Sequence, residues 1–166
     1  MSAHGAPLAA GSDSPGRLSA IFAALSHGAL VLACVALASL VVVEGWQVFA
    51  RYVLNDSPSW TEPVALLCMS TVMMMGAAVG VRGGRHFGFF IALEAAPPRV
   101  QRVLKAFAAL VAAAIGVLFA AWGFELAIDG WSVPMAGAPV PQGTVYLPIA
   151  LGGALIALFS LAKLGD

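Results

Sequence analysis

The sequence predicts an all-α membrane protein with four transmembrane helices and a short interfacial helix on the cytoplasmic side. Of its 166 residues, 61% are hydrophobic and only 10% are charged, and the mean hydropathy is +0.94, whereas soluble domains contain about 45–50% apolar residues. Apolar runs long enough to cross the hydrocarbon as helices, about 20 residues each, cover approximately residues 22–50, 63–81, 106–126 and 145–162. A membrane β-barrel would show many alternating segments of about 10 residues, which the sequence lacks.

The chain divides into a tail and one membrane domain. Residues 1–19 are rich in Gly, Ser, Pro and Ala, so we expect a flexible cytoplasmic tail. They do not resemble a secretory signal peptide, because the apolar run that follows is too long and no small-residue cleavage site closes it early. Residues 20–164 would then form a single four-helix transmembrane domain.

The basic residues predict how the helices are oriented, because Lys and Arg near membrane helices favour the cytoplasm. Of the segments that flank the four spans, the two that would be external contain only Arg51. The other basic residues lie on the remaining segments: Arg17, Arg82, Arg85, Arg99, Arg102, Lys105 and Lys163. We therefore expect both termini in the cytoplasm. The formal net charge is zero, so nothing indicates a nucleic-acid partner.

The large aromatic residues support this orientation independently. Tryptophan and tyrosine prefer the headgroup level of a membrane, because one end of the ring is apolar and the other is polar. The residues of this kind all fall near the predicted external boundary: Trp46, Tyr52, Trp60, Trp122, Trp131 and Tyr146.

The first span ends in a polar stripe within "VVVEGWQVFARY". Glu44, Gln47 and Arg51 are spaced i, i+3 and i+7, so they share one face of the helix. A polar stripe near the end of a membrane helix faces water or protein and rarely lipid. Two interpretations remain open: a solvated helix end, or a contact with a partner or with the second span. Arg51 could then pair with Glu44 or Glu62.

The second span follows a turn of about ten residues, "LNDSPSWTEP", that is rich in turn formers. Thr61 can cap the second span, and Pro63 would fall in its first turn, where the missing N–H costs nothing. Within this span, Gly76 and its small neighbours predict close helix packing, and the methionines would fill gaps.

The segment "RGGRHFGFFIALEAAPPRVQRVLK" predicts an interfacial helix over about residues 86–95. Its apolar strip is too short to span, and basic residues at both ends would meet anionic headgroups. Pro97 and Pro98 would end this helix.

The last two spans carry acids at one end and glycines within. Glu125 and Asp129, at i and i+4, share a face near the external end of the third span. Gly116 in the third span, and Gly152 with Gly153 in the fourth, predict close packing between helices.

The sequence contains no constellation that supports catalysis. It lacks the P-loop and the H-E-x-x-H pattern, and no Ser, His and Asp set shares one location. A haem would need His27 and His86 at one depth on two helices. An autonomous transporter would usually place an ionisable group near the bilayer centre, but Glu44 lies about 22 residues into its helix, roughly 33 Å along.

Three stretches resemble one family, in that family's order. "RYVLNDSPSWTEP" (51–63) is similar to the Arg-Tyr, Asn, Ser, Trp-Thr-Glu signature after the first helix of the small membrane subunit of tripartite ATP-independent periplasmic (TRAP) transporters, the DctQ type. "GAAVGVRGGRH" (76–86) resembles the family's small-residue helix end, and "PVPQGTVYLPIALGG" (139–153) resembles its turn into the last helix. With the four spans, the resemblance covers about residues 20–164. Where the family often has a second acid after Trp-Thr-Glu, this chain has Pro63.

The resemblance implies a subunit that depends on partners. It would form a stable complex with a large TRAP membrane subunit, which holds the substrate and sodium sites and moves as an elevator. A periplasmic substrate-binding protein would dock transiently and deliver an organic acid, such as a dicarboxylate, sugar acid or keto acid. The small subunit would widen the static scaffold in the lipid of a bacterial inner membrane. It would bind no cofactor, substrate or sodium, and it would not be an enzyme.

The polar helix ends and the resembling stretches define a set of structural or partner-contact candidates. They are Glu44, Arg51, Tyr52, Asp56, Trp60, Glu62, Arg82, Arg85, His86, Glu125, Asp129 and Tyr146. The five acids in this set oppose Arg51 alone on the expected external side, and charge of one sign can steer a partner. We therefore expect the binding protein to dock partly over this face, although an ordinary hydrated acidic rim would have the same composition.

Two other functional classes fit the composition. A small four-helix multidrug exporter would work as a proton-coupled dimer through a membrane carboxylate, for which Glu44 is the candidate. A haem-bearing electron carrier would use the two histidines. Proton-coupled transport by the chain alone would identify the first class, and a Soret band would identify the second.

Overall fold

The computed structural model describes residues 17–83 and 97–164. The predicted interfacial helix at about 86–95 lies outside these ranges, as do Arg85, His86 and most of the predicted tail. Four described helices are long and apolar enough to cross a membrane, which confirms the predicted all-α membrane fold.

Three of the helices, α1, α2 and α4, are longer than the apolar runs that predicted them, whereas α5 begins two residues after the predicted 145. The elements in chain order are α1 (Arg17–Phe49), the π-helical turn η1 (Ala50–Leu54), α2 (Thr61–Gly83), α4 (Pro98–Asp129), the 3-10 turns η2 (Gly130–Ser132) and η3 (Gln142–Tyr146), and α5 (Leu147–Ala162). Helix α4 begins eight residues before the predicted 106, because Pro98 at its first position has its backbone angle already set for a helix. Three basic residues, Arg99, Arg102 and Lys105, are therefore helical.

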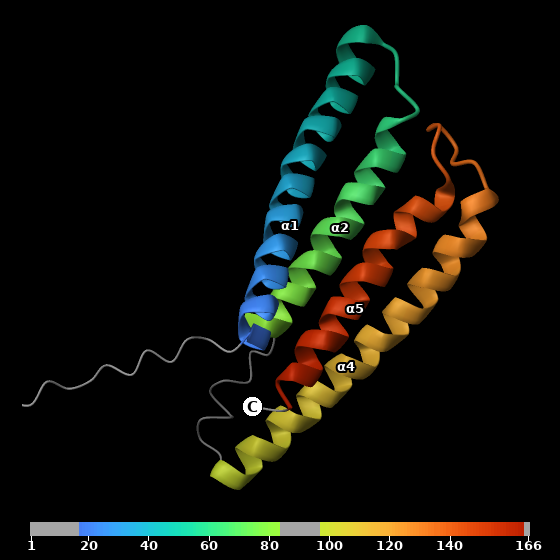
Figure 1. The fold of residues 1–166 in the computed structure, drawn as a ribbon. Coiled ribbons are helices and arrows are strands. Elements are labelled where there is room, and N and C mark those ends of the chain that lie inside the picture. Colours follow the sequence, from blue (N-terminus) through green and yellow to red (C-terminus); the bar gives the residue numbers. More distant parts are fainter. Residues whose placement is uncertain (1–16, 84–96, 165–166) are drawn as a thin grey trace, which may run out of the picture.

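The helices lie in a row in the order α1, α2, α5, α4 (Figure 1). Helix α2 packs between α1 and α5, and α5 packs between α2 and α4. In a closed four-helix bundle, each helix would instead pack against two neighbours around a common core. Because the row is open, most of the large apolar side chains remain exposed in the single chain.

The two ends of the row differ in charge. The α1–α2 turn and the α4–α5 loop both lie at one end, which we call the turn end (Figure 1). At the opposite end, the basic end, lie all the described Lys and Arg residues except Arg51: Arg17, Arg82, Arg99, Arg102, Lys105 and Lys163. The basic residues are thus separated from the turn end, as the sequence predicts.

Glycines allow α4 and α5 to approach closely. A Cβ atom on Gly153 would lie 2.5 Å from the Ala120 backbone nitrogen, and one on Gly116 would lie 2.6 Å from the Ala157 backbone nitrogen. The predicted packing role of these glycines is confirmed. By contrast, a Cβ atom on Gly76 would meet nothing within 4 Å, so the expectation that Gly76 brings helices of this chain together is wrong.

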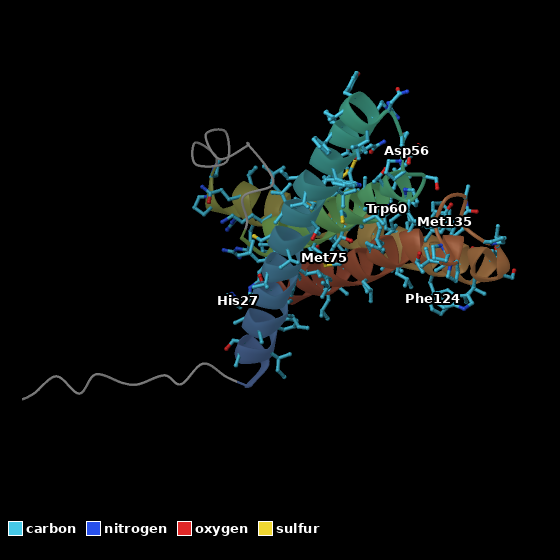
Figure 2. All side chains as sticks on the ribbon, turned by 90° about the horizontal axis from the view of Figure 1, so that it is seen from above. His27, Asp56, Trp60, Met75, Phe124 and Met135 are labelled. Carbon is cyan, nitrogen blue, oxygen red and sulfur yellow. The ribbon has the colours of Figure 1, made fainter. Side chains whose placement is uncertain are left out.

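A small apolar core joins α1, α2 and α5 toward the basic end. Met75 of α2 is 3% exposed and packs with Ala29 and Ala33 of α1. Phe22 of α1 meets Phe159 of α5 edge to face, with ring centroids 6.2 Å apart. Figure 2 shows α1 running across the direction of α4 and α5.

Candidate functional site

The polar stripe at the end of α1 lines a recess between α1 and α2 at the turn end. This α1–α2 recess has a volume of about 320 Å³. Its polar lining is Glu44 and Gln47 from α1, Arg51 from η1 and Glu62 from α2. Apolar side chains complete the lining: Leu40, Ala65, Leu66 and Met69. The spacing-based prediction that Glu44, Gln47 and Arg51 share a face is therefore confirmed.

Opposite charges in the recess do not meet. Between the described residues Arg51, Glu44 and Glu62 the structure contains no ion pair within 4.0 Å. The Arg51 guanidinium instead donates a hydrogen bond of 3.4 Å to the Ser57 hydroxyl. All three charged side chains are exposed in the single chain. The interpretation that Arg51 pairs inside this chain with Glu44 or Glu62 is wrong.

The α1–α2 turn is held by two local features. Asn55 adopts the left-handed conformation with φ of 53°, and its N–H donates to the Ala50 carbonyl. This conformation ends the helix, and Asn tolerates it better than most residues. Helix therefore continues through Arg51 to Leu54, four residues beyond the predicted end. The fully buried Thr61 begins α2, and its hydroxyl donates to the Pro58 carbonyl at 2.8 Å, so it acts as a donor rather than as the predicted acceptor cap.

The turn also contacts the α4–α5 loop, a contact that the sequence did not indicate. The Ser59 hydroxyl donates to the Gly137 carbonyl at 3.4 Å. Gly137 has φ of +87°, and a Cβ there would collide with the Ser59 carbonyl oxygen. Figure 2 shows Trp60 and Met135, from the turn and the loop, beside each other. The α1–α2 hairpin and the α4–α5 hairpin are thus joined at the turn end, in addition to the packing of α2 against α5.

The remaining candidates at the turn end form its exposed rim. Asp56 in the turn and Glu125 with Asp129 in α4 are exposed, so they carry acidic charge on both hairpins. Tyr52 is 80% exposed and Trp60 is 43% exposed. Tyr146 ends η3 and is half-buried. The structure brings Glu44, Arg51 and Glu62 together in the recess, whereas Tyr52, Asp56, Trp60, Glu125 and Asp129 are spread along the exposed rim.

A second recess at the turn end is almost wholly apolar. It lies between α4 and the start of α5 and has a volume of about 520 Å³. Phe124, Ile128 and Trp131 line it together with Leu147. Such a lining fits lipid chains or an apolar partner surface, and the hydroxyl it contains is that of Ser132.

At the basic end, Arg82 lies over the Phe159 ring, 5.8 Å from its centroid. One of its terminal nitrogens, Nη1, is buried without a hydrogen-bond partner. Burial lowers the pKa of the nearby Lys163, at the end of α5, from its usual value. The guanidinium over the ring is a cation–π contact that links α2 to α5. The other two candidates of this region, Arg85 and His86, lie outside the described residues.

The fold and the site together define a class of protein. The chain is a multi-pass membrane protein whose helices form an open row and whose polar groups gather at the ends. Within residues 17–83 and 97–164, no three His, Cys, Asp or Glu side chains lie close enough together to hold a metal ion.

The chain belongs to the family of the DctQ component of tripartite ATP-independent periplasmic transporters, because residues 40–166 match the model of that family. No curated protein matches the chain. Members of the family are transporter components that work with a large membrane subunit and a binding protein. The chain is accordingly a multi-pass inner-membrane protein and the small membrane subunit of such a transporter. The matched region includes the α1–α2 recess and the turn.

Proposed function

We propose that the chain is the static scaffold subunit of a sodium-coupled importer of an organic acid of the dicarboxylate, sugar-acid or keto-acid class. In this proposal, a periplasmic binding protein delivers the acid, and the large subunit binds both the acid and sodium. The small subunit holds the large one in place and faces the cytoplasm with both termini.

The open row of helices is the observation that supports the proposal most strongly. Large apolar side chains stay exposed along every helix, from Val42 in α1 to Phe107 in α4. Two sides of the row are therefore available to a partner helix or to lipid. The described helices lie side by side and share only a small apolar core, an arrangement that favours a supporting role over that of an autonomous exporter.

The charge of the turn end supports a role for this end in docking the binding protein. Five acidic side chains oppose Arg51 there, and three of them, Asp56, Glu125 and Asp129, are exposed on the rim. Charge of one sign raises the rate at which an oppositely charged protein meets a surface. A basic patch on the binding protein would be the matching surface.

Reconstitution in liposomes tests the proposal. The chain is expressed together with its large subunit, and uptake is measured with the binding protein outside and a sodium gradient directed inward. We expect uptake only when both membrane subunits, sodium and the binding protein are present. Uptake that persists without this chain, or a chain that never retains the large subunit in detergent, would overturn it.

Proton-coupled transport by this chain alone would support the alternative, an exporter that works through Glu44. The matched measurement uses liposomes that contain only this chain under a pH gradient, with Glu44→Gln as the control. We expect no transport in either sample.

A further inference from the structure

The α1–α2 recess leaves one carboxylate of the membrane helices without a cation. Glu44 is exposed, and the side chains one turn away on its own helix are Leu40, Val41, Gln47 and Val48, none of which is basic. Across the recess, α2 contributes Glu62 as its only charged group, and that group is also acidic. The described part of this chain therefore supplies no partner to Glu44 except the distant Arg51.

Glu44 lies nearer to the middle of the helices than Arg51, the cation of the recess. Seven residues separate it from Arg51, which corresponds to about 10 Å of helix. Met69 and Leu66 of α2 line the same recess on the apolar side. A charged side chain near the end of a membrane helix faces water or protein and rarely lipid, and it commonly pairs with a group of opposite charge. The α1–α2 recess leaves room beside Glu44, and the described part of this chain places no cation at that depth.

We propose that the α1–α2 recess receives a Lys or Arg side chain from a transmembrane helix of the large subunit, and that this cation pairs with Glu44. Leu40, Leu66 and Met69 would pack against the apolar part of the same helix. This inference rests on the proposed function in one respect, namely the stable complex with the large subunit.

The order of charges in the recess favours a protein side chain over a lipid headgroup. In a zwitterionic phospholipid the amine lies nearer to water than the phosphate does. The matching protein site would have its carboxylate outermost and its guanidinium deeper. Here Arg51 is outermost and Glu44 is about 10 Å deeper. A side chain on a partner helix can enter at the depth of Glu44, whereas a lipid amine would have to pass below its own phosphate.

The first experiment measures how well tagged variants of this chain retain the large subunit in detergent. We expect Glu44→Gln to weaken retention about tenfold, because it leaves the partner's cation unpaired, and Glu44→Lys to weaken it further. Glu44→Asp keeps the carboxylate and is the matched control, for which we expect most of the retention. If wild-type chain fails to retain the large subunit, the proposed function fails. If wild-type and Glu44→Lys chains retain it equally, only the present inference fails.

The second experiment identifies the partner residue by photo-crosslinking. A benzophenone amino acid replaces Leu66, which lines the recess and is 52% exposed, or Leu110 of α4, which is 55% exposed and lies outside the recess. We expect the Leu66 probe to crosslink a large-subunit peptide that contains a membrane-embedded Lys or Arg, and the Leu110 probe not to crosslink that peptide. Crosslinks from Leu66 to lipid alone, or to a peptide without such a residue, would overturn the inference.

A charge exchange distinguishes a lost contact from a misfolded variant. The identified Lys or Arg is changed to Glu and combined with Glu44→Lys, so the pair is restored with reversed signs. We expect this double variant to recover most of the retention that either single change abolishes. If the double variant retains the large subunit no better than the single variants do, a direct pair is contradicted.

Discussion

The close approach of α4 and α5 at Gly153 makes a prediction whose magnitude follows from the structure. A Cβ atom at this position would lie 2.5 Å from the Ala120 backbone nitrogen, whereas ordinary contacts begin at 3.4 Å. In Gly153→Ala the two helices must therefore separate locally by about 0.9 Å. Neither contacting group can rotate away, because both Ala120 nitrogen and the Gly116 carbonyl oxygen belong to the backbone.

A separation of this size affects the whole contact between the helices. A radial gap of about 0.5–1 Å forfeits a quarter to a half of the dispersion energy of each contacting pair. Overpacking of a well-packed contact typically costs about 1–3 kcal/mol. We expect Gly153→Ala to destabilise the chain by this amount, with loss of α4–α5 packing before the helices themselves unfold.

Gly76→Ala is the matched control, because a Cβ atom at Gly76 meets nothing within 4 Å. Ala is a better helix former than Gly by up to about 1 kcal/mol, so this variant should be as stable as wild type or slightly more stable. Unfolding by sodium dodecyl sulfate in mixed micelles, followed by circular dichroism, gives the free energy of unfolding for each variant. If the Gly153→Ala and Gly76→Ala variants unfold at the same detergent fraction, the proposed tight contact does not exist.

Three further predictions concern the turn end. Asn55→Ala should destabilise the helix end by about 1 kcal/mol, because Ala tolerates the left-handed conformation less well, and Asn55→Gly should not; equal unfolding of the two would contradict the role of Asn55. Thr61→Val should cost about 0.5–1.5 kcal/mol through loss of the hydrogen bond to Pro58, while Thr61→Ser, measured in the same micelles, keeps the donor. Asp56→Lys combined with Asp129→Lys should slow uptake at low salt and flatten its salt dependence; unchanged uptake at every salt concentration would exclude steering by the acidic rim.

The sequence predicted the elements and one face of the site well. Long apolar runs define membrane helices regardless of tertiary context, so each of the four predicted spans corresponds to a helix within residues 17–83 and 97–164. The spacing of Glu44, Gln47 and Arg51 placed them on one face, and that face lines the recess. Turn formers such as Asn55 predicted where the first hairpin turns, because few residues adopt its left-handed conformation easily.

The arrangement of the helices could not be predicted in this way. In a membrane, side chains that face lipid are as apolar as those that face another helix, so the pattern of hydrophobic residues does not show which sides pack. Gly76 and Gly153 look alike in sequence, yet only Gly153 contacts a neighbouring helix. The contact between Ser59 and Gly137 joins residues 78 positions apart, and no local signal indicates it.

The row of helices also determines how much membrane the chain occupies. Four helices side by side have a longer perimeter in the bilayer plane than the same helices in a closed bundle. One long side can be covered by protein while the other remains in lipid, so a chain of 166 residues can displace the lipid along a broad stretch of a neighbouring subunit. The composition of the lipid next to that subunit is then set partly by the exposed side chains of the row.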